Sequence, residues 1–186
     1  MNVNFRSLYI LIGIALSACS EPDSGLQLDR YDGLGDQLRL TDHEGQPFEL
    51  SQKKGKVLLL FFGFTHCPDI CPVTLSRLGQ VAGQVGGEQQ SVEIVFVSVD
   101  PKRDTPERLH GYLGEFAYVA TGLTGSPEQI AEVARNWAVG YEQAENGRDV
   151  DHTSWTYVID REGTVRFLFN SEHTIAEMAE LVEKLL

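Results

Sequence analysis

The distribution of apolar residues along the chain predicts a regular fold from about residue 37 onward. Apolar and polar residues alternate over 37–50 and are interrupted by a turn-forming sequence at 42–45, which predicts a β-hairpin. Residues 57–62 (VLLLFF) and 92–99 (VEIVFVSV) are almost continuously apolar. Such runs are typical of strands that are buried on both faces of a sheet.

Helical spacing of apolar residues occurs in four segments, namely 73–85, 106–115, 127–138 and 174–186. Two of them have start signals, because Pro106 follows Thr105 at a first helical position and Ser126 with Gln129 forms a capping box. Residues 155–159 and 165–169 predict a second hairpin. Strands that alternate with helices and end in a hairpin and a helix predict an α/β fold, with a mixed central sheet flanked by helices.

The first 18 residues have the pattern of a signal peptide. Arg6 supplies a positive charge, and the apolar run at 8–16 is too short to span a bilayer as a mature helix. The run leads through Ser17 and Ala18 to Cys19, which resembles the lipobox of bacterial lipoproteins, where the cysteine carries the lipid. An ordinary secretory signal with a chance cysteine is the alternative. We expect a lipoprotein signal peptide at 1–18, a flexible tether at 19–36 and one domain at 37–186.

Composition excludes several classes of protein. The chain has 186 residues, of which 42% are hydrophobic, so it is long and apolar enough for one domain with a core. Asp and Glu number 27 against 15 Lys and Arg, which gives a formal net charge of −12. We expect no nucleic-acid partner, because such a partner requires a basic face that displaces the counterions of the phosphates.

The candidate chemistry lies in residues 64–72 (FTHCPDICP), directly after the buried strand at 57–62. In open α/β sheets, ligands bind at the carboxyl edge of the strands. We expect Cys67 at a helix start with Pro68 in the first turn, so that Cys71 shares one helix face with it and both thiolates are favoured at neutral pH. Two thiolates select Cu(I) or Zn²⁺, or the pair closes a disulfide. A purely structural disulfide across so short a loop adds little stability.

His152 is the best remaining donor for a metal site. It ends a polar loop at 142–151 and precedes the strand at 155–159. In a thioredoxin-like topology the start of that strand faces the cysteine loop. Neutral imidazole is a good ligand for copper, and Asp151 or a backbone carbonyl can orient its second nitrogen. A simple hydrogen bond within the loop is the alternative role of His152.

Three segments together resemble the Sco/SenC family of copper-binding assembly factors for cytochrome c oxidase. They are Cys67-Pro68-Asp69-Ile70-Cys71-Pro72, residues 97–106 (VSVDPKRDTP), and Asp151-His152-Thr153 before residues 157–160 (YVID). The resemblance runs from about residue 35 to the end of the chain. It implies a thioredoxin-like fold, with Cys67, Cys71 and His152 as the copper ligands. It also implies a metallochaperone that takes up Cu(I), and Cu(II) as well, and assists assembly of the oxidase copper site.

The expected partners follow from the same resemblance and from the signal peptide. The client is the apo copper subunit of a respiratory oxidase, and a thiol reductant is a further partner. With Cys19 lipidated, the protein is expected in the bacterial cell envelope, as a periplasmic lipoprotein anchored in a membrane.

Two other functions compete with copper delivery. A thiol-disulfide oxidoreductase would use Cys67 and Cys71 as a redox pair to reduce the copper-ligand cysteines of the client, and would leave His152 without a necessary role. A peroxidase-type thiol enzyme ranks last, because the Pro-x-x-x-Thr-x-x-Cys pattern of peroxiredoxins is absent: Leu60 and Phe64 stand where its Pro and Thr are required.

The remaining candidates have modest expected roles. His66 is a tuning residue or a fourth ligand whose side chain points away from that of its neighbour Cys67. Asp100 and Asp104 either affect the site electrostatically or form turns and caps. Three other histidines, namely His43, His110 and His173, are expected on the surface.

Overall fold

The computed structural model describes residues 31, 33–35, 37–85, 91–143 and 150–186, so the expected signal peptide, Cys19 and most of the tether lie outside the described residues. Seven strands form one sheet in the order β2-β1-β5-β4-β3-β8-β9. They are β1 (Arg39–Asp42), β2 (Pro47–Glu49), β3 (Val57–Gly63), β4 (Val92–Ser98), β5 (Ala120–Thr124), β8 (Thr156–Ile159) and β9 (Val165–Phe169). A second, two-stranded sheet consists of β6 (Tyr141–Gln143) and β7 (Val150–His152).

The sheet is mixed, as predicted. Strands β3, β4 and β5 are parallel, β8 runs antiparallel to β3, and β9 runs antiparallel to β8. At the other edge, the predicted N-terminal hairpin of β1 and β2 pairs antiparallel with β5. The parallel centre and the C-terminal hairpin give the expected thioredoxin-like arrangement.

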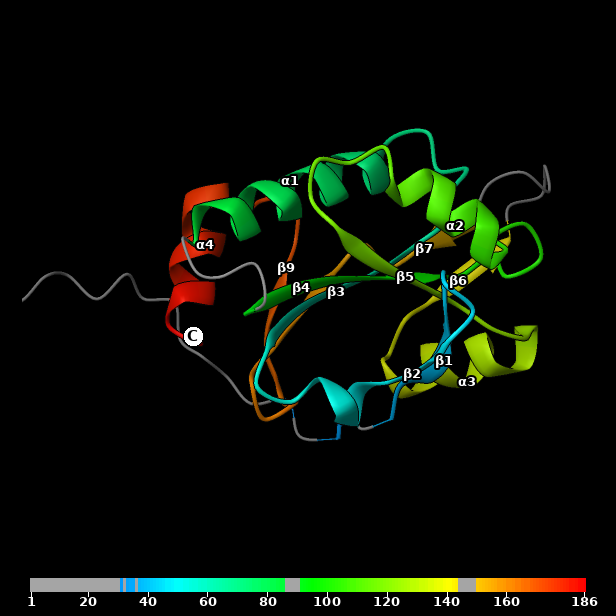
Figure 1. The fold of residues 1–186 in the computed structure, drawn as a ribbon, viewed down its shortest axis with the longest axis horizontal. Coiled ribbons are helices and arrows are strands. Elements are labelled where there is room, and N and C mark those ends of the chain that lie inside the picture. The colour runs from blue at the N-terminus through cyan, green and yellow to red at the C-terminus, as the bar shows by residue number, and fades with distance from the viewer. Residues whose placement is uncertain (1–30, 32, 36, 86–90, 144–149) are drawn as a thin grey trace, which may run out of the picture.

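Four helices flank the sheet. They are α1 (Ile70–Gln84), α2 (Pro106–Leu113), α3 (Pro127–Asn136) and α4 (Ile175–Glu183), and a short 3-10 helix, η1 (Leu50–Lys53), follows β2. Figure 1 shows α1 and α2 on one side of the sheet and α3 on the other, and α4 packs beside α1. None of the helices in the described part is both long enough and apolar enough to cross a bilayer.

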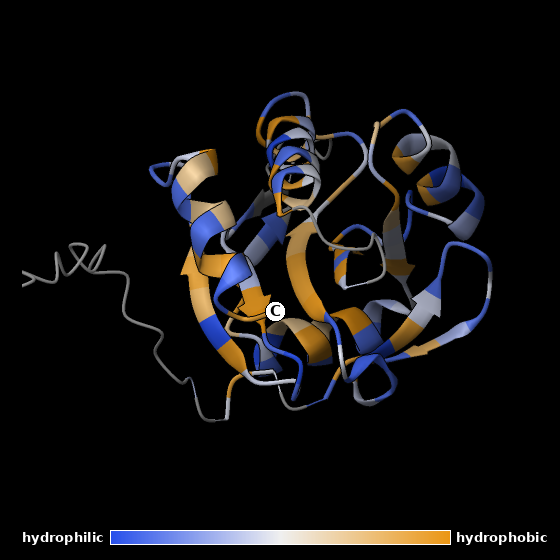
Figure 2. Ribbon diagram, turned by 60° about the vertical axis from the view of Figure 1, so that its left-hand side comes forward, coloured by the Kyte–Doolittle hydropathy of each residue, from blue (hydrophilic) through white to orange (hydrophobic). Residues whose placement is uncertain are grey.

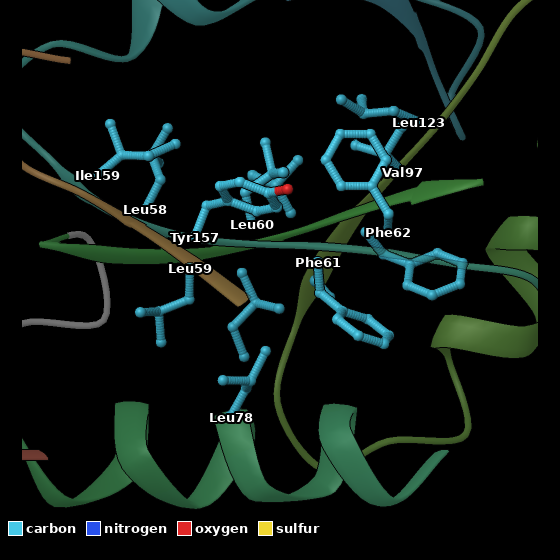
Figure 3. Packing of buried hydrophobic residues seen from close by; sticks show 14 of the residues in the cluster. Leu58, Leu59, Leu60, Phe61, Phe62, Leu78, Val97, Leu123, Tyr157 and Ile159 are labelled. Carbon is cyan, nitrogen blue, oxygen red and sulfur yellow. The ribbon is translucent and has the colours of Figure 1, made fainter. Parts of the chain in front are cut away.

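Strand β3 lies at the centre of the core, and all seven of its residues are buried. Leu59 and Phe61 point toward α1, where Leu78 faces them, whereas Leu58 lies on the opposite side of the sheet (Figure 3). The hydrophobic residues accordingly concentrate on the central strands, while polar residues follow the loops and alternate with apolar ones along the helices (Figure 2). The expectation from the run VLLLFF is therefore confirmed.

The start signals of the helices also have the expected geometry. The Thr105 hydroxyl accepts a hydrogen bond from the Arg108 backbone N–H, at 3.3 Å. In the capping box, the Ser126 hydroxyl accepts from the Gln129 N–H at 3.2 Å, and the Gln129 side-chain oxygen accepts from the Ser126 N–H at 2.8 Å. These bonds satisfy backbone donors that the first turn of a helix leaves without partners.

Two features were not predicted. Strand β5 has the sequence ATGLT, which carries only a weak strand signal; its conformation comes from pairing with β4 on one side and β1 on the other. The expected loop at 142–151 is bounded by β6 and β7, which pair with each other, so His152 is the last residue of a strand.

On the α3 side of the sheet, Trp137 is fully buried and contacts the rings of Phe62 and Tyr157, at centroid distances of 6.0 and 5.2 Å. The Tyr157 hydroxyl donates to the Trp137 carbonyl at 2.7 Å. The backbone of Gly35, at a φ of +78°, lies against the indole so closely that an added Cβ would come within 2.7 Å of the ring. Gly35 therefore brings the N-terminal segment directly onto this aromatic cluster.

We predict that Gly35→Ala destabilises the domain more than Gly33→Ala does. Both residues have φ near +80°, but Gly33 has open space around its Cα. Gly33→Ala should cost about 1 kcal/mol for the left-handed backbone alone, and Gly35→Ala about 2 kcal/mol or more beyond that for the clash with the Trp137 ring. Urea unfolding followed by tryptophan fluorescence measures both; equal losses would contradict the packing role of Gly35.

Candidate metal centre

The cysteine loop connects the end of β3 to α1, at the carboxyl edge of the parallel strands. Helix α1 begins at Ile70, so the expectation that Cys67 starts the helix is wrong: Cys67 lies in the preceding turn, where its N–H donates to the Phe64 carbonyl at 3.2 Å. Pro68 accounts for the difference, because a proline disfavours helical backbone at the residue before it. Of the two cysteines, Cys71 alone is helical, in the first turn of α1.

Both cysteines are free thiols, and they differ in exposure: Cys67 is half-buried and Cys71 is fully buried. The Cys71 sulfur lies directly above the backbone of Gly63, where an added Cβ would come within 2.8 Å of it. Gly63 ends the central strand, so the absence of a side chain there allows the sulfur to lie close to the sheet.

Burial raises the pKa of the Cys71 thiol well above its usual range, and the neighbouring Cys67 and Asp104 add to the rise, against a hydrogen bond with the Phe64 backbone that lowers it. The expectation of a thiolate at neutral pH is therefore wrong for Cys71. A helix N-terminus contributes typically about 0.3–1 kcal/mol, which is worth less than one pKa unit, whereas burial can move a pKa by roughly 3–5 units.

His152 brings its ring directly to Cys71. The His152 Nε2 lies 3.6 Å from the Cys71 Sγ, and Nδ1 lies 3.0 Å from the backbone carbonyl of Thr153. A carbonyl only accepts hydrogen bonds, so Nδ1 carries the proton and Nε2 presents its lone pair to the sulfur. The rings of Phe61 and Phe64 lie edge-on to the imidazole, at centroid distances of 6.0 and 5.8 Å.

Cys71 and His152 thus come together although they are 81 residues apart in the sequence. The Cys71–His152 separation fits two donors on one ion, since bonds of about 2.0 and 2.3 Å to a small ion in tetrahedral geometry place the donors roughly 3.5 Å apart. Among the described residues, Cys67, Cys71 and His152 are not one of the sets whose donor atoms all lie within 4.8 Å of one another. Cys71 and His152 are therefore a preformed pair, and Cys67 lies in the turn that precedes α1.

Asp104 supports the cysteine loop through hydrogen bonds to Thr65, a role that was not predicted from the sequence. Its buried carboxylate accepts from the Thr65 N–H at 3.0 Å, the Thr65 hydroxyl at 2.7 Å and the Ser98 hydroxyl at 2.6 Å. It therefore links the end of β4 to the residue two before Cys67. The only sequence signal for this role is that Asp104 directly precedes the helix start at Thr105, and turn formation explains an aspartate there equally well.

Asp100 is also buried, and it pairs with Arg103. An electrostatic effect of Asp104 on the site is supported, because its charge contributes to the raised pKa of Cys71. Turn formation therefore does not account for all the contacts of these two aspartates.

Among the described residues, His43, Glu44 and His110 also bring donor atoms within 4.8 Å of one another, but the ring of His43 is engaged elsewhere. His43, expected on the surface, is only 16% exposed, and its Nδ1 accepts from the Gly122 N–H at 2.8 Å, so Nε2 carries the proton and offers no lone pair. His110 is exposed as expected and contacts Glu44 at 2.8 Å. His173, also expected on the surface, is partly buried against the rings of Phe167 and Phe169.

Comparison with known proteins shows similarity over most of the chain. The family model described as SCO1/SenC matches residues 28–186. The SCO2-like protein RP587 of Rickettsia prowazekii is 34% identical over 187 residues, which cover 96% of this chain and 90% of that protein.

Two of the solved structures with a similar fold are Sco proteins. Bradyrhizobium japonicum ScoI with copper bound superposes with a TM-score of 0.76 at 36% identity, over 82% of this chain and 99% of that one. BsSco, a member of the Sco family of cytochrome c oxidase assembly proteins in which a disulfide switch was identified, superposes with a TM-score of 0.70 at 25% identity, over 85% of this chain and 96% of that one.

The unequal surroundings of the two thiols predict unequal reactivity toward iodoacetamide in the metal-free protein. Cys67 should be alkylated at least about 100-fold faster than Cys71 at pH 8, because alkylation requires an accessible thiolate and Cys71 is buried with a raised pKa. Mass spectrometry of the single variants Cys67→Ser and Cys71→Ser measures the two rates separately. Similar rates would show that Cys71 is not held as a buried thiol.

The same raised pKa links stability to pH. The folded-state pKa of Cys71 lies above the unfolded value of about 8.5. Ionisation of this thiol therefore does not lower the free energy of unfolding below that pH, and it lowers it increasingly as the pH rises above that value. The loss should be smaller in Cys71→Ser, which has no thiol to ionise at that position.

Proposed function

We propose that this chain, which belongs to the SCO1/SenC family, binds one copper ion through Cys67, Cys71 and His152 and delivers it to the apo copper subunit of a respiratory oxidase. The observation that carries the proposal is the Cys71–His152 pair, with Nε2 at 3.6 Å from the sulfur and Nδ1 engaged by a carbonyl. Metal-ligating histidines usually have this second hydrogen bond, which fixes the ring and the tautomer.

The donor set suits copper as cargo. Two thiolates and an imidazole are soft to intermediate donors, which favour Cu(I); the imidazole also accommodates Cu(II). The similarity to a copper-bound ScoI supports copper over other soft ions. Binding replaces the proton on Cys71, so copper affinity is expected to rise with pH while that thiol would otherwise stay protonated.

A second function, thiol-disulfide exchange with the client, is favoured by the unequal exposure of the two thiols. The half-buried Cys67 is placed to attack a disulfide sulfur of the client, forming a mixed disulfide and releasing one client thiol. Cys71 then attacks the Cys67 sulfur, with its proton passing to His152 Nε2, and the second client thiol leaves. The chain ends oxidised and requires a thiol reductant to return to the copper-binding state.

The proposed place of action is the bacterial cell envelope. It rests on the signal-like segment at 1–18 and on lipidation of Cys19, which would anchor the domain at a membrane through the segment at 19–36. Loss of membrane association in a Cys19→Ser chain would support the lipid anchor, and unchanged association would contradict it.

An anaerobic Cu(I) titration against a competing chelator tests the ligand set. In a chain carrying Cys19→Ser, which leaves two thiols, we expect one copper per chain, and an affinity at least about 100-fold lower in His152→Ala, since removal of even an outer-shell partner costs 10–100-fold. The Cys67–Cys71 pair should still form and lose its disulfide reversibly in His152→Ala, because both thiols remain.

The matched control is His110→Ala, which removes an exposed histidine from α2 and should bind copper like the parent chain. Copper binding that is indifferent to His152 would leave thiol-disulfide exchange as the main function. Normal oxidase maturation in cells that carry His152→Ala would contradict copper delivery.

A further inference from the structure

His152 approaches Cys71 from a small sheet of its own. Strands β6 and β7 form a two-stranded sheet, separate from the seven-stranded one, and His152 is the last residue of β7. Tyr141 lies opposite His152 in this ladder, so the next pair is formed by Gly140 and Thr153. The hydrogen bonds within that pair therefore act directly on the residue that follows the histidine.

Gly140 and Thr153 depart from the hydrogen bonds of a regular antiparallel pair, in which two opposite residues exchange both N–H···O=C bonds. One of these bonds is present, because the Thr153 N–H donates to the Gly140 carbonyl at 2.9 Å. For the return bond, the Gly140 N–H donates to the Thr153 side-chain hydroxyl at 3.1 Å. The hydroxyl thus occupies the acceptor place that the Thr153 carbonyl has in a regular ladder, and it donates its own hydrogen to the Gly140 carbonyl at 3.4 Å.

This exchange of acceptors makes the Thr153 carbonyl available to His152. The carbonyl oxygen lies 3.0 Å from Nδ1 and accepts its hydrogen. The lone pair of the neutral ring then lies on Nε2, 3.6 Å from the Cys71 sulfur. A second hydrogen bond of this kind fixes the ring and the tautomer in metal-ligating histidines. Through its own carbonyl, Thr153 thus determines which nitrogen faces the sulfur.

We propose that Thr153 is a positioning residue for His152: its hydroxyl takes the bond from the Gly140 N–H, so that its carbonyl is directed to Nδ1 of the imidazole. The inference rests on the function proposed above and adds the group that holds one of the three ligands in place. Without the hydroxyl, the Gly140 N–H takes the Thr153 carbonyl as in a regular ladder, because a backbone donor rarely stays without a partner. The carbonyl is then withdrawn from the histidine, and the ring is free to turn and to change its tautomer.

A purely structural role of Thr153 would depend on the shape of its side chain rather than on the hydroxyl. Threonine is branched at Cβ, which favours extended backbone, and valine has the same shape and the same preference. Serine has the hydroxyl without the second branch. Thr153→Val and Thr153→Ser therefore separate the two roles, since each keeps what the other removes.

The first measurement is the tautomer of His152 in the metal-free, reduced chain. Two-bond ¹H–¹⁵N spectra of the imidazole rings at pH 8, where a histidine of ordinary pKa is neutral, distinguish an Nδ1–H ring from an Nε2–H ring. We expect the Nδ1–H form in the parent chain and in Thr153→Ser, and a mixture of both forms in Thr153→Val. His66 is the internal reference, being 42% exposed with its Nδ1 at 3.2 Å from the Thr65 hydroxyl, and its signals should not change.

The second measurement is the Cu(I) affinity, by the same anaerobic chelator titration of the chain that carries Cys19→Ser. Thr153→Val should bind copper about tenfold more weakly, which is the lower end of the loss that follows removal of an outer-shell partner, because the carbonyl itself remains. Thr153→Ser should bind copper like the parent chain. The matched control is Thr164→Val, in the turn between β8 and β9 at the edge where β3 begins, which should change neither the tautomer nor the affinity.

An unchanged tautomer or an unchanged affinity in Thr153→Val would overturn the inference, as would a change of both in Thr153→Ser or an Nε2–H ring in the parent chain. If Thr153→Val does not fold, Thr153→Ala is measured in its place. Loss of the fold in both would also overturn the inference, because Thr153 would then be required for the hairpin itself. A parent chain that binds Cu(I) no more tightly than His152→Ala would overturn the proposed function, and the tautomers would still decide whether Thr153 holds the ring.

Discussion

Strand β3 must bury both of its faces, and this requirement fixes where the cysteine loop lies. All seven residues of the strand are buried, with α1 on one side and the Trp137 cluster on the other. Because β3 is central, its carboxyl end is enclosed by neighbouring elements, and the chain turns at Gly63 directly into the cysteine segment. The same position that stabilises the core therefore removes Cys71 from water and raises its pKa.

The buried thiol in turn explains why Cys71 and His152 can already be in contact without a metal. A neutral thiol beside a neutral imidazole costs little to bury, whereas two thiolates without a metal would carry unpaired charge into the interior. In the metal-free chain, Cys71 keeps its proton and lies against the lone pair of His152 Nε2. Under the proposed function, an incoming cation would replace that proton, so the charge of the site would appear only together with the ion that compensates it.

Local signals predicted much of this molecule. The apolar runs identified β3 and β4, and the capping residues Thr105 and Ser126 marked helix starts that the structure confirms. Strand β5 was missed because its ATGLT sequence becomes a strand through its neighbours, and the helical placement of Cys67 was wrong because Pro68 overrides the i,i+4 pattern. The approach of Cys71 to His152 was predicted only with a topology in hand, since it joins residues 81 positions apart.

Asp104 is the clearest example of a residue whose role could not be predicted from the sequence. Beside Thr105 and Pro106 it has an adequate local explanation as a turn residue, but its acceptor atoms are used by Thr65, 39 positions away, and by Ser98. A buried carboxylate without such donors would be strongly destabilising, so the carboxylate and the cysteine loop stabilise each other's positions. The loop that holds one buried and one half-exposed sulfur is thereby rigid at Thr65 and open at Cys67. Under the proposed function, the fixed position of Thr65 would define where the ligands lie, and the accessible Cys67 sulfur would let copper enter and leave.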